Sequence, residues 1–273
     1  MYETETFLVE APDFHYGNKG SWKAYRQPSG HIVQLPVPSQ SELSSYYPKT
    51  YYSFADSSIP QINFKGPKAY FWASFLNLKR GYKLPIKANG LVTSLAGWIL
   101  KSKTWLSPHQ RENGTLVDFG CGSGDYLHIM KAFGWQVMGV ELSEDACRVG
   151  EKNGLRIING GVKELGELPA SSVDVIRSSH SLEHLVEIED FFRNAYHALK
   201  PGGVLLIDTP NAESISFKRT GKYWYYLALP VHVNIFSAES MRMNMEKAGF
   251  TNIQISTYTL FRVFCVELSC TKK

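Results

Sequence analysis

Four cysteines, a small net charge and the lack of long apolar runs already exclude several classes of protein. None of the four cysteines among the 273 residues has a CxxC spacing, so neither a disulfide framework nor a zinc ribbon is expected. The formal net charge is +4 and the basic residues are dispersed. A nucleic-acid-binding protein more often carries a concentrated basic stripe, and we therefore expect no nucleic-acid partner.

Apolar segments are too short to cross a bilayer. The run Leu91–Leu100 falls below the roughly 18 uncharged residues that a span requires, and it predicts a buried helix. The first residues, MYETETFLVEAPDF, lack the basic start and apolar core of a signal peptide. These patterns predict no membrane span and a cytoplasmic location.

The first 112 residues differ from the rest of the chain in composition and in the pattern of apolar residues. Residues 1–60 contain six prolines and many serines and tyrosines, which predict an irregular segment with short strands at Trp22–Tyr25 and His31–Gln34. Residues 66–107 have a mostly helical pattern. We expect residues 1–112 to form a helical and irregular cap.

Apolar runs alternate with helical patterns over residues 113–273, as is typical of repeated β-α units around a parallel sheet. The sequence therefore predicts an α/β, Rossmann-like, doubly wound and mostly parallel sheet of seven strands, with an insertion at 212–236. The predicted helices are Gly124–Phe133, Glu144–Asn153, Leu185–Leu199 and Ala238–Ala248. The predicted strands are Leu116–Phe119, Gln136–Glu141, Arg156–Asn159, Val173–Ser178 and Val204–Asp208, with Ile253–Tyr258 and Val263–Leu268 as a closing antiparallel pair.

A glycine loop follows the first of these strands. The segment VDFGCGSGD at 117–125 places Gly120, Gly122 and Gly124 at alternate positions. Glycines there let the backbone turn sharply and let a ligand lie against main-chain atoms. The first strand-to-helix crevice of an open α/β sheet is also where ligands bind. Cys121 is a small residue of this loop and not a nucleophile candidate, because no activating histidine is near it in sequence.

The loop differs from a dinucleotide fingerprint, which is GxGxxG. Here the spacing is GxGxG, and Asp118 and Asp125 flank it. These carboxylates would repel a pyrophosphate but suit an ammonium group and a sulfonium, which favours S-adenosylmethionine over NAD. Glu141 ends the second strand, 21 positions after Gly120, and is expected to accept hydrogen bonds from two ribose hydroxyls.

Four successive stretches, VDFGCGSG, VMGVELS, VDVIRSSHSLEHL and LKPGGVLLIDTPN, resemble the motifs of class I S-adenosylmethionine-dependent methyltransferases. The branch they resemble contains the ubiquinone-biosynthesis O-methyltransferases and many sugar and natural-product methyltransferases. Many relatives carry an acid at the position of Val162, so adenine recognition here would rest on nearby backbone groups and packing, with weaker affinity. The cofactor-binding residues that the resemblance implies are Asp118, Gly120, Cys121, Gly122, Gly124, Glu141, Leu142, Val162, Ser178 and Ser179.

The N-terminal region resembles a module that precedes some such domains. There a small zinc ribbon is followed by a segment similar to PSQSELSSYYPKTYYSF. The zinc-binding cysteines are absent from this chain, so the module would be zinc-free. Relatives with this layout often modify glycans or their precursors, which implies a small-molecule acceptor that is sugar-like.

Two histidines are candidates for the general base that methyl transfer to oxygen requires. His180 follows the fourth strand, where an acceptor should meet the methyl group, and His232 lies in the insertion. Each has a plainer alternative, as a pocket wall, a cap or a packed side chain. The aromatic run Tyr223–Tyr226 just before His232 predicts either a sugar-stacking wall or the core of a lid.

A divalent cation is a further alternative for the same histidines. Some family members hold magnesium or manganese with a Glu-x-x-Glu-His pattern and a distant histidine. This chain has His180, Glu183 and His184 in that pattern, with His232 as the distant residue. Because histidine replaces the first acid and hard cations prefer oxygen ligands, no metal is assigned.

The sequence thus predicts an S-adenosylmethionine-dependent methyltransferase, most simply an O-methyltransferase of a small polar acceptor. A non-catalytic scaffold that keeps the cofactor fold is the alternative from another class. An NAD-dependent oxidoreductase is disfavoured by the glycine spacing. A nucleic-acid amino-methyltransferase is disfavoured because Asp208-Thr209-Pro210-Asn211 does not supply an Asn/Asp-Pro-Pro-Tyr/Phe motif.

Overall fold

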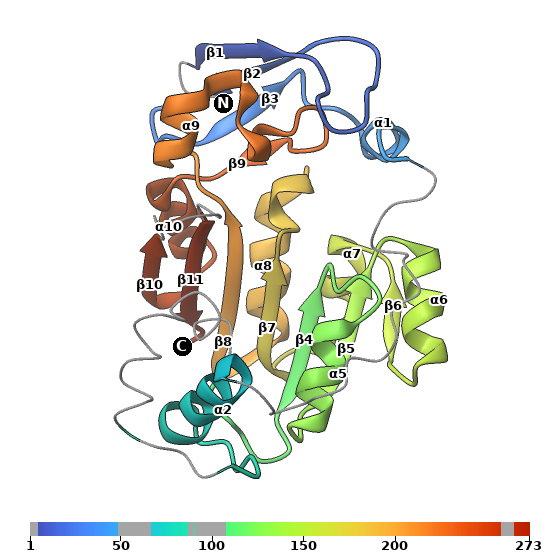
Figure 1. Cartoon of the computed structure of the whole chain (residues 1–273), viewed down its shortest axis with the longest axis vertical. Helices are drawn as coiled ribbons and strands as arrows, with labels where there is room; N and C mark the ends of the chain where they lie inside the picture. Colours follow the sequence, from blue (N-terminus) through green and yellow to red (C-terminus); the bar gives the residue numbers. More distant parts are fainter. Residues whose placement is uncertain (1–4, 49–66, 87–89, 91–107, 258–264) are drawn as a thin grey trace.

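The computed structural model describes residues 5–48, 67–86, 90, 108–257 and 265–273. Its main sheet has the strand order β10-β11-β8-β7-β4-β5-β6, in which the neighbours among β4 to β8 pair in parallel and β11 is antiparallel to both of its neighbours (Figure 1). This confirms the predicted α/β class. The strands are β4 (Thr115–Phe119), β5 (Gln136–Glu141), β6 (Ile157–Asn159), β7 (Val173–Ser179), β8 (Leu199–Pro210), β10 (Thr251–Thr257) and β11 (Cys265–Thr271).

Three of the four predicted helices begin within one residue of the predicted start, and a further short helix, Val162–Gly166, was not predicted. The fourth begins later than predicted. Leu182–His184 forms a single 3-10 turn and Leu185 returns to extended backbone, so α8 starts only at Ile188. That turn is what places Glu183 and His184 beside the ends of the strands. The helices are α5 (Asp125–Ala132), α6 (Glu144–Lys152), α7 (Val162–Gly166), α8 (Ile188–Ala198) and α10 (Ala238–Lys247).

Alternate residues of the strands fill two separate cores. Ile176 of β7 packs in one core with Phe191 of α8, whereas the preceding Val175 packs in the other with Leu127 of α5. The second core also receives a residue of α2 (Pro67–Arg80). Each such side chain contributes about 1.5–3 kcal/mol on full burial, and this two-sided packing holds the carboxyl ends of the strands in fixed positions.

The two short strands predicted at Trp22–Tyr25 and His31–Gln34 are present, as Trp22–Arg26 and Ile32–Leu35. They belong to a separate sheet, so the description of this part as a helical and irregular cap is wrong. The sheet has the order β1-β2-β3-β9 and is antiparallel. Its last strand comes from the predicted insertion, which therefore joins the N-terminal residues in one layer facing the carboxyl ends of β7 and β8 (Figure 1). The strands are β1 (Thr6–Ala11), β2 (Trp22–Arg26), β3 (Ile32–Leu35) and β9 (Asn234–Ile235).

Short helices complete this outer layer. α1 (Gln40–Ser45) is closed by a capping box, in which Ser39 accepts from the backbone of Glu42 and the Glu42 carboxylate accepts from the backbone of Ser39. The insertion contributes α9 (Ile215–Thr220), followed by 3-10 turns at Gly221–Tyr223 and Tyr225–Leu227.

Among the described residues, no helix combines the length and apolar character needed to cross a membrane. The run Leu91–Leu100, predicted to be a buried helix, lies outside the described residues.

Candidate active site

A cavity of about 490 Å³ opens at the carboxyl ends of β4, β5 and β7. The glycine loop and Glu141 form one part of its wall, and α1 with Tyr47 forms another. The wall of the cavity brings together residues that are far apart in the sequence. The lining residues are Gln40, Leu43, Ser44, Tyr47, Pro48, Phe119, Gly120, Cys121, Gly122, Val140, Glu141, Leu142, Ser143, Gly160, Ser179, His180, Ser181, His184 and Leu185.

The glycine loop needs glycine for two physical reasons. Gly120, Gly122 and Gly124 all have positive φ, at 71°, 55° and 91°, in a region that L side chains rarely adopt. At Gly120 a Cβ would also overlap the side chain of Ser181. The loop therefore presents bare main chain to the cavity, as a closely bound ligand requires.

Glu141 is fixed at the end of β5 by two backbone donors. Gly122 N–H donates to Oε2 and Ser143 N–H donates to Oε1, each at 2.9 Å. An ionised carboxylate has about four acceptor sites, so two remain for a ligand in the cavity that Glu141 lines. This geometry suits a pair of vicinal hydroxyl donors.

Asp118 lies beneath the glycine loop and does not line the cavity. Its side chain is 2% exposed and accepts a hydrogen bond from Arg177 Nη1 at 2.7 Å. The Arg177 guanidinium also lies 4.0 Å from the centroid of the Tyr126 ring. The ion pair and the ring contact anchor the loop from below, which differs from the direct ligand contact that the resemblance implied.

The other predicted cofactor residues divide into two groups. Gly120, Cys121, Gly122, Glu141, Leu142 and Ser179 line the cavity, and Leu142 is 58% exposed. The remaining predicted residues do not line it: Ser178 and Val162 are buried, and Gly124 packs against Leu155. The first group is placed to touch a ligand, whereas the second supports the walls.

His180 projects into the cavity from the end of β7 in a left-handed conformation, with φ 52°. Its Nδ1 lies 3.3 Å from Glu183 Oε1, and its Nε2 lies 3.6 Å from Asp208 Oδ2. The Tyr226 ring stacks on the imidazole, with centroids 6.0 Å apart and planes at 20°. Burial alone would lower the pKa of His180, but Glu183 and Asp208 outweigh it and raise the pKa above its usual value.

Glu183 is the buried partner that orients His180. It is 1% exposed and also accepts a hydrogen bond from Thr209 Oγ1 at 3.0 Å. Burial opposes its ionisation, but the hydrogen bond from His180 and the neighbouring imidazoles lower the pKa of Glu183 to about 2. An ionised Glu183 carboxylate beside Nδ1 favours a proton on that nitrogen, which in the neutral imidazole leaves Nε2 as the acceptor.

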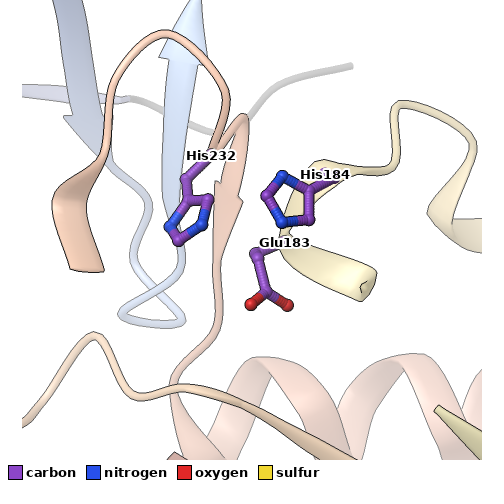
Figure 2. A group of neighbouring side chains, drawn as sticks. All are labelled: Glu183, His184 and His232. Carbon is purple, nitrogen blue, oxygen red and sulfur yellow. The ribbon is translucent and has the colours of Figure 1, made fainter. Parts of the chain in front are cut away.

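Glu183 also belongs to a group with His184 and His232, shown in Figure 2. The three side chains offer ligand atoms that all lie within 4.8 Å of one another. His184 Nδ1 is 2.9 Å from the Val231 carbonyl, and His232 Nδ1 is 2.8 Å from the Tyr226 carbonyl. Because a carbonyl oxygen only accepts, these contacts indicate that both Nδ1 atoms carry protons, which leaves Nε2 of each neutral ring as the nitrogen with a lone pair that could coordinate a cation.

The donor set of this group decides which cation it fits. Two imidazole nitrogens and one carboxylate suit zinc and similar transition metals better than magnesium, which prefers oxygen ligands. Burial lowers the pKa of His232 to about 3, so this imidazole stays neutral and able to coordinate. The residues therefore fit a borderline divalent cation.

Several residues of the site were not found from the sequence. Asp208 and Thr209 sit at the end of β8 and reach His180 and Glu183. Tyr47 Oη lies 2.7 Å from His184 Nδ1, although 137 positions separate the two residues. The position of Asp208 at a strand end beside β7 was the available signal. Tyr47 stands in the segment PSQSELSSYYPKTYYSF that resembles an N-terminal module, but nothing in that segment pointed to a contact with His184.

Comparison with known proteins identifies the family of the domain that holds this cavity. A family model described as a methyltransferase domain matches residues 95–255. A probable S-adenosylmethionine-dependent methyltransferase of Mycolicibacterium smegmatis is 28% identical over 144 residues, which cover 52% of this chain and 54% of that protein. A demethylmenaquinone methyltransferase of Staphylococcus aureus is 20% identical over 212 residues, covering 68% of this chain and 86% of that protein.

Solved structures share the fold. An S-adenosylmethionine-dependent methyltransferase from Archaeoglobus fulgidus superposes with a TM-score of 0.54 at 19% identity, over 66% of this chain and 94% of that one. The chain spans about half the length of the Mycolicibacterium relative. With its family model matched over more than half of its residues, the chain belongs to the methyltransferase domain family, whose cofactor in these relatives is S-adenosylmethionine.

Proposed function

We propose that the chain transfers the methyl group of S-adenosylmethionine to a hydroxyl oxygen of a small polar acceptor. The observation that carries this proposal is the place of His180, whose ring lines the same cavity as the glycine loop and Glu141. In this proposal Glu141 holds the ribose, Leu142 packs on the adenine with Val162 behind it, and the loop with Ser179 faces the methionine part. The branch that the sequence resembles supports a sugar-like acceptor.

The reaction needs little from the protein beyond alignment and one proton acceptor. S-adenosylmethionine supplies a methyl group on a sulfonium, and the sulfur keeps the electron pair as the acceptor oxygen bonds to the methyl carbon. His180 Nε2 takes the hydroxyl proton, because Glu183 holds Nδ1–H. Asp208, 3.6 Å from Nε2, stabilises the imidazolium that results.

The demethylmenaquinone methyltransferase among the relatives supports a second acceptor class, the phenolic or quinone ring. A screen should therefore include both sugars and hydroxylated aromatics. Transfer to sugars and not to phenols supports the sugar-like acceptor, and the reverse result replaces it.

The cofactor part of the proposal is tested by calorimetry with S-adenosylmethionine and its demethylated product. We expect saturable binding that Glu141→Ala abolishes, with NAD as the control ligand. If neither adenosyl ligand binds, the alternative of a non-catalytic scaffold replaces the enzyme. If both bind but no acceptor class is methylated, a scaffold that retains its cofactor is favoured.

A second proposal concerns the Glu183, His184 and His232 group, favoured by the closeness of its three ligand atoms, which all lie within 4.8 Å of one another. We propose that it can hold one borderline divalent cation next to the acceptor. A cation bound there would lower the pKa of an acceptor hydroxyl and so help His180 to remove its proton. Metal analysis of the purified protein tests this occupancy directly.

A further inference from the structure

A second cavity lies in the outer layer, apart from the site described above. It has a volume of about 230 Å³ and is built from two segments, Ala11–His15 at the end of β1 and Lys222–Leu229 of the insertion. Three aromatic rings at its wall are largely exposed: Phe14 at 55%, and Tyr223 and Tyr225 at 68% each. Large exposed aromatic side chains gathered around one cavity indicate a contact surface.

These rings are held in place before any ligand arrives. Phe14 and Tyr223 lie 5.5 Å apart between centroids, and His15 and Tyr225 lie 4.7 Å apart. His15 Nε2 is also 2.8 Å from the Tyr225 carbonyl oxygen, which ties the two segments together. A surface that is already ordered loses less conformational freedom on binding, so it can hold even a small ligand.

The chemistry of the wall selects a ligand that is apolar on one face and polar at its edge. Tyrosine rings offer apolar faces together with hydroxyl groups. Lys222 Nζ lies 5.2 Å from the centroid of the Tyr223 ring and adds up to three donors. A purely aliphatic ligand would leave these polar groups without partners. The volume is below the about 300 Å³ of a pocket for a drug-sized molecule, which limits the ligand to about one ring.

We propose that this outer cavity binds a sugar ring, stacked on Tyr223 or Tyr225, with a hydroxyl or acidic substituent at Lys222. Ring contacts also link the wall of this cavity to the active site. The Tyr225 ring lies 5.0 Å from the Tyr226 ring, which stacks on His180. A sugar on Tyr225 is thus one aromatic residue away from the proposed base. That this sugar is a remote unit of the acceptor rests on the proposed function, whereas binding of the sugar does not.

Saturation-transfer NMR on the full chain tests the proposal, with methyl glucoside, methyl glucuronide and cyclohexylmethanol as probes. We expect dissociation constants on the order of 1 mM for the two glycosides, as suits a small ligand with few contacts. Tyr223→Ala and Tyr225→Ala should each weaken binding at least fivefold. Lys222→Ala should weaken glucuronide binding more than glucoside binding.

Phe7→Ala is the matched control, because Phe7 is also 55% exposed but does not line this cavity. Glycoside signals that are absent, or unchanged in the two tyrosine variants, overturn the proposal. Binding of cyclohexylmethanol without either glycoside overturns it in favour of an apolar ligand. Thermal denaturation of the same variants shows whether they are folded, and calorimetry with S-adenosylmethionine separates failure of this proposal from failure of the proposed function.

Discussion

Arg177 Nη1 donates a hydrogen bond to Asp118 Oδ1 at 2.7 Å, beneath the loop that forms the cofactor wall. Both side chains are largely buried, at 14% and 2% exposed. A buried ion pair adds little net stability over well-packed apolar residues, but a single buried charge left without its partner is costly. The loop therefore depends on both members of the pair being present.

Replacing Arg177 by Met is expected to lower the free energy of unfolding by about 3–5 kcal/mol, because the Asp118 carboxylate is left buried and unpaired. Urea denaturation measures the loss. The double variant Arg177→Met, Asp118→Leu should recover much of it. Arg193→Met is the control, because its ion pair with Asp190 is exposed and should change stability by less than about 1 kcal/mol. Equal losses in the two arginine variants would contradict the prediction.

Gly120→Ala is expected to weaken S-adenosylmethionine binding at least tenfold, since the new Cβ overlaps Ser181 and distorts the loop. Calorimetry gives the affinity. Gly202→Ala is the matched control: Gly202 has a similar φ of 72° and open space around it, so it tests backbone strain alone. Adding Ser181→Gly to Gly120→Ala should restore part of the affinity, and a double variant no better than the single one would rule out the overlap as the cause.

The parallel sheet and the cavity were predictable because their signals are local. Runs such as VMGV are apolar over successive residues, as strands buried on both faces require, and β5 falls at the predicted residues Gln136–Glu141. The glycines needed for positive φ and the acid ending β5 are likewise encoded within a few positions. Where the residue type itself reflects the local backbone conformation, the sequence is sufficient to predict the structure.

Contacts made across the chain were not predictable. β9 has only two residues and exists because Asn234 pairs with Val33, so nothing in its own sequence marks a strand. The burial of Asp118 depends on Arg177 from β7, a pairing 59 positions apart. Motif position implied a ligand contact for Asp118, whereas the structure pairs its carboxylate with Arg177 and does not place it among the residues lining the cavity.

His180→Asn is expected to lower kcat about 10²–10⁴-fold, the usual contribution of a positioned general base, while the affinity for S-adenosylmethionine changes little. Single-turnover transfer to an identified acceptor gives the rate, and calorimetry gives the affinity. His197→Asn, an exposed histidine of α8, is the control. An unchanged kcat in His180→Asn would assign the proton to another acceptor.

Zinc is expected to raise the melting temperature of the protein through the Glu183, His184 and His232 group, since a ligand that binds only the folded state stabilises it. Magnesium at the same concentration should have a smaller effect, given two nitrogen donors. His232→Asn should remove the zinc effect, whereas His197→Asn should leave it intact. A zinc effect that survives in His232→Asn would place the metal elsewhere on the chain.

His31 makes the outer layer sensitive to acid. Its ring is 9% exposed and stacks on Phe236, with centroids 4.7 Å apart and planes at 18°. Burial lowers the pKa of His31 from 6.5 to about 4, so between these two pH values the unfolded chain binds a proton that the folded chain does not. The contribution of His31 to the free energy of unfolding is therefore fully present above pH 6.5, and it decreases as the pH falls toward 4.

The free energy of unfolding is expected to decrease through His31 by at most about 1.4 kcal/mol for each pH unit in this range. Urea denaturation of the protein and of His31→Leu at a series of pH values measures it, because the difference between the two curves cancels the titration of other groups. The difference should shrink or reverse in favour of His31→Leu as the pH falls below 6.5. His197→Leu, at an exposed position, should follow the unmodified protein at every pH. Parallel curves for His31→Leu and the unmodified protein would show that His31 takes up its proton equally in the folded and unfolded states.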